Sequence, residues 1–165
     1  MSWESFISNI YYKNVPEGQM GQCVEKAGII TKADRQVVGS AGGFTLTSYP
    51  FEMPNEDESG TQTVHVDETA LLFEAIDNEG VVSSPAGIRI SGDKYYLVVH
   101  DTERSVLYLK KHEGGACVAW SNNAVIFGSW QGALTTTGAK EIPQSPGMCN
   151  GQCEAVAEYL RANNS

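Results

Sequence analysis

Long apolar runs and basic residues are both scarce in this chain of 165 residues. The longest uninterrupted apolar runs span four or five residues, which is too short to cross a bilayer. Eleven Lys and Arg stand against 20 Asp and Glu, giving a net charge of −9. Duplex nucleic acid is therefore disfavoured as a partner, because its binding depends on Lys and Arg that displace condensed counterions.

The excess negative charge is concentrated in residues 52–79. This segment contains nine acidic residues and no Lys or Arg, and the remainder of the chain is balanced at eleven against eleven. Runs of like charge are usually solvated surface, and charges at the rim of an interface mainly change the association rate. A solvated surface and a direct role in an interface are both open interpretations of this segment.

Motifs for catalysis or metal binding are also lacking. The chain has no GxxxxGK[ST] phosphate loop, and His65, His100 and His112 fall in no zinc-binding spacing. Cys149 and Cys153 lie four residues apart and are expected to be small buried side chains. Because these motifs are missing, we expect a protein that is not an enzyme and needs no metal. A hydrolase that uses His100 remains a distant alternative.

The N-terminus shows neither the basic start nor the apolar stretch of a secretory signal. All four cysteines are therefore expected to be thiols in a reducing compartment, which predicts a soluble cytoplasmic protein.

The hydrophobic periodicity predicts one domain with an α+β fold. From Gly87 to Trp130, five strand-like segments are separated by the short polar turns SGD, DTE, HEGG and SNN, which predicts an antiparallel meander. Residues 44–66 are expected to form a loop or small hairpin outside the core, and residues 131–146 a long polar connection. Further strands are expected at 23–30 and 36–40, and helices at 2–12, 68–79 (capped by Asp67) and 147–163.

Three large aromatic residues, Trp3, Phe6 and Tyr159, fall on the first and last predicted helices. If these helices lie side by side, the three rings form a partly exposed shelf. Such a shelf suits proline-rich segments, whose preformed left-handed helix docks on aromatic rings at low entropic cost. The alternative is that all three are ordinary packing residues, since aromatic side chains are commonly interior.

Several segments carry a family resemblance. They are MSWESF at the N-terminus, SSPAGIRISGDKYYLVV and LYLKKHEGGACVAWSNNAVIFGSW in the meander, and SPGMCNGQCEAVAEYL near the C-terminus. In order and spacing they resemble profilin, the family of small actin-monomer-binding proteins. The acidic stretch NEDESGTQTVHVDETALL also resembles an inserted hairpin of apicomplexan profilins, which suggests a protist member.

The resemblance implies a central antiparallel sheet of about six or seven strands, with the terminal helices packed side by side on one face and the middle helix on the other. It implies a single domain over 1–165 with insertions at about 44–66 and 131–144. It also implies two partners and no cofactor, namely monomeric actin on the later strands and proline-rich proteins such as formins between the terminal helices. Carried over position by position, the actin-binding residues are Tyr108, Lys110, Ser145, Gly147, Asn150 and Glu154, and the polyproline-binding residues are Trp3, Phe6 and Tyr159.

Two departures from the family pattern predict weak binding of proline-rich segments. Val38 stands where many profilins have a tryptophan, and Ser165 stands where animal forms end in tyrosine. Each aromatic contact contributes about 1 kcal/mol beyond its burial, so two losses correspond to roughly thirtyfold in affinity. Phosphoinositide lipids are disfavoured by the charge of −9 and by Tyr108 where the family's basic strand has arginine. We expect a monomer.

The alternative from another class is a small-molecule sensor of the PAS type, which also wraps helices around a five-stranded antiparallel sheet. It requires an interior ligand cavity. Strands this rich in Val, Ile, Leu and Tyr are instead expected to fill their own core.

Overall fold

The computed structural model of the chain describes residues 3–14, 20–22, 24–131 and 146–163. Its centre is a seven-stranded antiparallel sheet with the strand order β4-β3-β11-β10-β9-β8-β7. The strands are β3 (Lys26–Thr31), β4 (Val37–Ala41), β7 (Ile88–Ile90), β8 (Asp93–Asp101), β9 (Val106–Lys111), β10 (Gly114–Trp120) and β11 (Ala124–Gln131).

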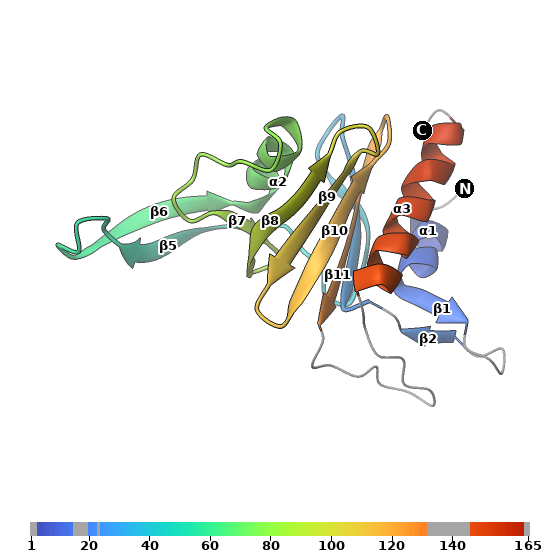
Figure 1. Cartoon of the computed structure of the whole chain (residues 1–165), viewed down its shortest axis with the longest axis horizontal. Helices are drawn as coiled ribbons and strands as arrows, with labels where there is room; N and C mark the ends of the chain where they lie inside the picture. The colour runs from blue at the N-terminus through green and yellow to red at the C-terminus, as the bar shows by residue number, and fades with distance from the viewer. Residues whose placement is uncertain (1–2, 15–19, 23, 132–145, 164–165) are drawn as a thin grey trace.

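The two terminal helices lie side by side on one face of this sheet, and the middle helix lies on the other (Figure 1). They are α1 (Trp3–Tyr11), α3 (Pro146–Ala162) and, on the opposite face, α2 (Glu68–Asp77). The amide Nε2 of Gln152 in α3 donates a hydrogen bond of 2.7 Å to the carbonyl oxygen of Asn9 in α1. The α+β arrangement predicted from the sequence is confirmed.

Two hairpins form separate two-stranded sheets outside the central sheet. The strands β1 (Tyr12–Asn14) and β2 (Met20–Gln22) pair beside the terminal helices, and β5 (Ser48–Pro54) and β6 (Thr61–Asp67) form a longer hairpin that projects away from the sheet (Figure 1). The first helix therefore ends at Tyr11, earlier than predicted, because the next three residues enter a strand. Strands of three residues are too short for alternation to reveal them.

The base of the β5–β6 hairpin is fixed by one buried carboxylate, that of Glu68. It accepts hydrogen bonds from the backbone N–H of Thr47 (2.9 Å), the backbone N–H of Gly92 (2.8 Å) and the hydroxyl of Tyr49 (3.2 Å). Next to it, Asp67 caps α2 as predicted, accepting from Ala70 N. A small hairpin was one of the two expectations for residues 44–66, but placing the whole segment outside the core was wrong, because Val66 is fully buried.

The core has two main layers, one on each face of the sheet. Side chains alternate along each strand, so Val106 packs toward the terminal helices and Leu107 packs toward α2. The buried side of α3 is formed by Cys149, Cys153, Val156 and Leu160, as predicted.

Glycine allows the terminal helices to approach the strands closely at two points. A Cβ on Gly128 of β11 would lie 2.5 Å from the Sγ of Cys153, and a Cβ on Gly39 of β4 would lie 2.7 Å from Cγ1 of Ile7. Both separations are well below ordinary van der Waals contact. The absence of a side chain at these positions is therefore what lets α3 and α1 seat on the sheet.

We expect Gly128→Ala to lower the free energy of unfolding by about 1–3 kcal/mol, since overpacking a tight core contact forces backbone or side-chain shifts. The matched control is Gly151→Ala in the exposed interior of α3, where an added Cβ meets nothing within 4 Å. The control should raise the free energy of unfolding by about 0.5–1 kcal/mol, because alanine favours the helix. Urea unfolding measures both changes, and equal effects of the two variants would contradict the close approach.

Candidate functional site

The helix α3 packs mainly against β10 and β11, which leaves β8 and the Lys110 end of β9 uncovered on that face. In the register of these two strands, Tyr96 lies opposite Lys110 and Val99 lies opposite Tyr108. Directly opposed residues share a face of the sheet, so these four side chains form one surface next to α3.

A hydrogen-bonded group joins this surface to α3. The Tyr108 hydroxyl donates to Oε2 of Glu154 at 2.8 Å, and the Arg104 guanidinium forms an ion pair with Oε1 of the same carboxylate. Arg104 comes from the turn between β8 and β9, so three separate elements meet at one carboxylate. Burial, followed by the hydrogen bond to Glu154, raises the pKa of Tyr108 to about 12. The phenol therefore remains a neutral hydrogen-bond donor at physiological pH.

The two consecutive lysines of β9 have different environments. Lys110 is exposed on the same face as Tyr108. Lys111 points to the opposite face, where its Nζ donates to Oε1 of Glu25 at 2.5 Å and to Oδ2 of Asp93 at 3.0 Å. Of these two lysines, Lys110 is therefore the one that is accessible to a partner.

The other residues predicted for the actin-binding surface lie at and just before the start of α3. Gly147 and Asn150 precede Glu154 by seven and four residues, so all three lie on one side of the helix. Gly147 is exposed and Asn150 is half-buried. Ser145, the other residue predicted here, lies outside the described residues.

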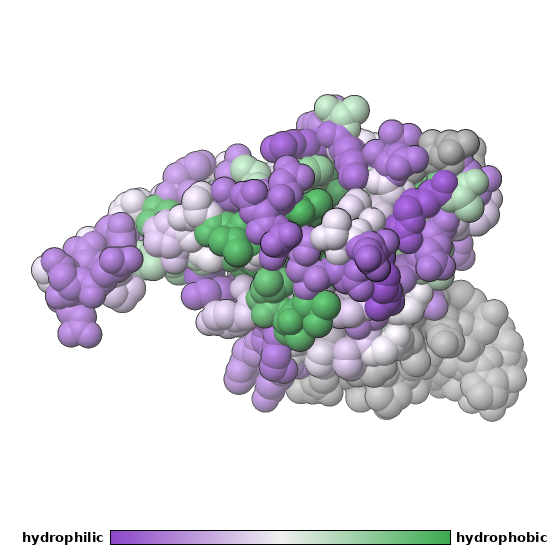
Figure 2. Space-filling model, turned by 45° about the horizontal axis from the view of Figure 1, so that its top comes forward, coloured by the Kyte–Doolittle hydropathy of each residue, from purple (hydrophilic) through white to green (hydrophobic). Residues whose placement is uncertain are grey.

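The structure adds an apolar strip that sequence reasoning missed. Within β8, Tyr96 is 61% exposed, Val98 58% and Val99 40%. Apolar side chains gather near the middle of the molecule in Figure 2, whereas the tip of the projecting hairpin is hydrophilic. In the sequence these residues belong to the run KYYLVVH, which is typical of a buried strand, and only the position of α3 shows that they are uncovered.

The three predicted aromatic residues form a second surface, which we call the aromatic row. The ring centroids of Trp3 and Phe6 are 6.0 Å apart, and those of Phe6 and Tyr159 are 5.8 Å apart. Tyr159 is 48% exposed and Trp3 is half-buried, but Phe6 is buried. The shelf is therefore presented by the two outer rings, and Phe6 supports them from below.

Three cysteine thiols meet beneath α3, where Cys153 contacts Cys117 and Cys149. All three are free and fully buried. The neighbouring thiols, together with burial, hold the pKa of Cys153 well above its usual range. Cys149 and Cys153 are therefore small buried side chains in the core, as expected from the sequence. Cys23 lies outside the described residues.

Comparison with known proteins identifies the family. The profilin family model matches residues 1–165. The chain belongs to the profilin family. A profilin from Tetrahymena pyriformis is 36% identical over 141 residues, which cover 85% of this chain and 88% of that protein.

Solved profilins share this fold. Profilin II of Acanthamoeba castellanii superposes with a TM-score of 0.65 at 18% identity, covering 99% of this chain and all of that chain. Mouse profilin IIa, solved in complex with a double repeat from the FH1 domain of mDia1, superposes with a TM-score of 0.56 at 15% identity, covering both chains completely.

The general function of the protein follows from its membership of this family. Profilins are non-enzymatic proteins that bind actin, and this profilin is accordingly an actin-binding regulator of filament assembly. The PAS-type alternative is not favoured.

Two further findings concern the described residues alone. None of their helices is both long enough and apolar enough to traverse a membrane. Nor do they contain a group of three or more His, Cys, Asp or Glu side chains placed to hold a metal ion.

The raised pKa of Tyr108 can be tested by ultraviolet titration, with Tyr108→Phe identifying its step. We expect ionisation at about 12, above the ordinary value of 10.0. Glu154→Gln should lower this pKa without restoring 10.0, because burial persists. Since the unfolded chain ionises first, the contribution of this phenol to stability should decline as the pH rises from 10.0 toward 12. A Tyr108 step at the ordinary value, with circular dichroism still native, would contradict the buried contact.

Proposed function

We propose that this profilin binds one actin monomer through the uncovered surface of β8, β9 and the start of α3. The observation that carries the proposal is the position of α3, which leaves an apolar strip beside a cationic side chain. The centre of the surface contains Tyr96, Val99 and Tyr108, and Lys110 supplies a charge at its edge. Protein interfaces are enriched in aromatic residues at their core and place charges at the rim.

The part of α3 at this surface is held by Tyr108 and Arg104 through Glu154. Gly147 and Asn150 lie near the N-terminus of the same helix. A partner that contacts both the strands and the helix start therefore meets a prearranged surface, which reduces the entropic cost of binding.

The mechanism we infer is competitive occupancy. A protein that covers one end of an actin monomer blocks addition at the pointed end of a filament and permits delivery to the barbed end. It requires no catalysis by the profilin itself and no cofactor, because the nucleotide belongs to actin.

Tyr96→Ala tests the actin surface. We expect the dissociation constant for monomeric actin to rise by roughly five- to thirtyfold, corresponding to about 1–2 kcal/mol for an aromatic residue at the centre of an interface. Sequestration of pyrene-labelled actin measures the affinity. The matched control is Tyr159→Ala, an exposed tyrosine on the aromatic row, which should leave actin affinity unchanged. Equal actin affinity of Tyr96→Ala and the parent would remove β8 from the interface.

We propose that the aromatic row binds proline-rich segments weakly. Trp3 and Tyr159 present partly exposed rings supported by Phe6, and the terminal helices that carry them are in direct contact. Val38 packs against the same core as a smaller side chain, so it adds no ring to the row. With two exposed rings, and with valine in place of a third ring at position 38, we expect proline-rich segments to bind weakly.

Tyr159→Ala tests the aromatic row. Loss of one well-placed ring should weaken binding to polyproline by about 1 kcal/mol, or roughly fivefold. Retention on immobilised polyproline measures this change, with Tyr96→Ala as the control that should be retained like the parent. Each tyrosine variant is thus the test in one assay and the control in the other. If Tyr159→Ala and Trp3→Ala were both retained fully, the aromatic row would not be the binding site.

We further propose that the β5–β6 hairpin is the acidic insertion of a protist-type profilin, within a single domain that also has an insertion at about 131–144. The hairpin's acidic tip residues, Glu56, Asp57 and Glu58, project away from the sheet, which supports a solvated role or contact with a partner. We infer that the protein acts as a cytoplasmic monomer.

A further inference from the structure

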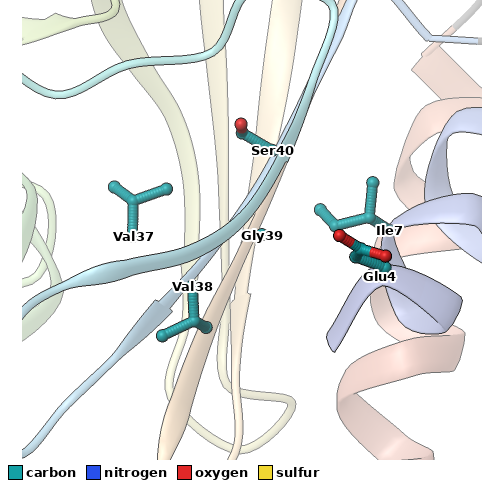
Figure 3. Close-up of a pocket in the computed structure, with 6 residues that line it drawn as sticks. All are labelled: Glu4, Ile7, Val37, Val38, Gly39 and Ser40. Atoms are coloured by element: carbon teal, nitrogen blue, oxygen red, sulfur yellow. The ribbon is translucent and has the colours of Figure 1, made fainter. Parts of the chain in front are cut away.

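Edge strands expose unpaired backbone N–H and C=O groups, which can pair with another chain. The edge strands of the central sheet are short. The strand β7 has three residues, and β4 has five and lies beside α1, where Glu4 and Ile7 are next to Gly39 (Figure 3). The hairpin strands β5 and β6 have seven residues each, and among the described residues they pair only with each other. Both outer edges of this hairpin are therefore free of a neighbouring strand.

Two backbone hydrogen bonds show which residues of the hairpin face the partner strand. At the tip, the N–H of Asn55 donates a bond of 2.9 Å to the carbonyl oxygen of Gly60. At the base, the N–H of Glu68 donates a bond of 3.0 Å to the carbonyl oxygen of Thr47. Both pairs continue the register of the ladder. Because the direction of the N–H and C=O groups alternates along a strand, the odd-numbered residues of β5 and the even-numbered residues of β6 point inward.

The two outer edges of the hairpin therefore differ. Two of the outward residues of β5 are Pro50 and Pro54, which have no N–H to donate. Along β6, the outward residues are Thr61, Thr63 and His65, whose backbone N–H and C=O groups have no hydrogen-bond partner among the described residues. Proline thus blocks strand pairing along β5, whereas the edge of β6 keeps all of its donors and acceptors.

The charge around β6 indicates what kind of chain fits this edge. A hollow of about 450 Å³ lies between the hairpin and the loop before β7, and its lining residues are Asn55, Glu56, Asp57, Gln62 and Pro85. The charges in this lining are two carboxylates, and residues 52–79 contain no Lys or Arg. A cationic side chain placed here reduces the repulsion between the carboxylates. A second copy of this chain is disfavoured as the added strand, because its hairpin carries the same negative charge.

We propose that an extended basic segment of a partner protein adds to the edge of β6 as a third strand. Its backbone pairs with Thr61, Thr63 and His65, and its Lys or Arg side chains lie near the carboxylates of the tip. In this mode of recognition main-chain hydrogen bonds provide affinity, and alternate side chains provide specificity. The site uses different elements from the actin-binding surface and from the aromatic row, so it adds a third partner to the two proposed above.

The probe is a capped peptide of seven residues, the length of β6, in which lysine and valine alternate. Its binding to the parent protein at low salt is measured by fluorescence anisotropy, and amide hydrogen exchange is followed by NMR. We expect the amides of Thr63 and His65 to exchange more slowly with the peptide bound, because they become hydrogen-bonded. The matched control is the outward amide of Glu52 on β5, which should remain fast.

Two N-methylated versions of the peptide separate strand addition from simple attraction between charges. One lacks the N–H groups of three lysines and the other those of three valines, so that both keep the same charge. Because only one alternate set of residues faces β6, one version should bind more weakly by roughly tenfold or more, and the other should bind like the parent peptide.

Thr63→Pro tests the same edge from the side of the protein. It removes one outward N–H and leaves the ladder of the hairpin intact, so we expect binding of the lysine–valine peptide to weaken by about fivefold or more. The matched control is Ser48→Pro, which removes an outward N–H from β5 and should bind the peptide like the parent. NMR spectra of both variants check that the hairpin is retained.

Equal binding of the two N-methylated peptides would overturn the proposal, because the contact would then depend on charge alone. Unchanged exchange at Thr63 in the presence of bound peptide would also overturn it, and so would a failure of the peptide to bind the parent protein. A peptide with glutamate in place of lysine should bind more weakly, and equal affinity of the two would exclude a basic partner. None of these outcomes depends on the actin-binding surface or the aromatic row.

Discussion

The close contact between α3 and the strands β10 and β11 determines which surfaces of this protein are free. Gly128 removes the side chain that would collide with Cys153, so the helix settles over the middle of the sheet. The side chains beneath it are small, including Cys117 and Ala119. Because α1 occupies the neighbouring position, the helical layer extends no further than Val106 and Tyr108 of β9. The strand β8 and the Lys110 end of β9 therefore remain open to a partner.

The same helix contributes to both proposed binding surfaces. Glu154 lies beside β9, whereas Tyr159 lies beside α1, and five residues of an α-helix correspond to a rotation of about 140° between them. Two partners on these surfaces therefore approach from different directions. This geometry suits a protein that holds an actin monomer while a proline-rich segment binds elsewhere, and it explains why substitutions of Tyr96 and Tyr159 should be separable.

Electrostatics divides the molecule in a similar way. The acidic tip of the β5–β6 hairpin projects from the side that carries α2, and Glu68 anchors the base of this hairpin through backbone and hydroxyl donors. On the sheet, Lys111 is neutralised by Glu25 and Asp93, which leaves Lys110 as the exposed lysine of β9. Local pairing, rather than the net charge, therefore sets the sign of the surface next to α3.

The sequence by itself indicated the family through the resemblance of its motifs in order and spacing. It also determined the meander and the terminal helices, because periodicity and turn residues act locally along the chain. It also identified Trp3, Phe6 and Tyr159 as one group, and the contact between α1 and α3 bears out their proximity. It could not show that Phe6 is buried or that Val98 and Val99 are exposed, because the same apolar residues occur in covered and uncovered strands. Only tertiary packing decided these points, since exposure depends on where a helix distant in the sequence comes to rest on the sheet.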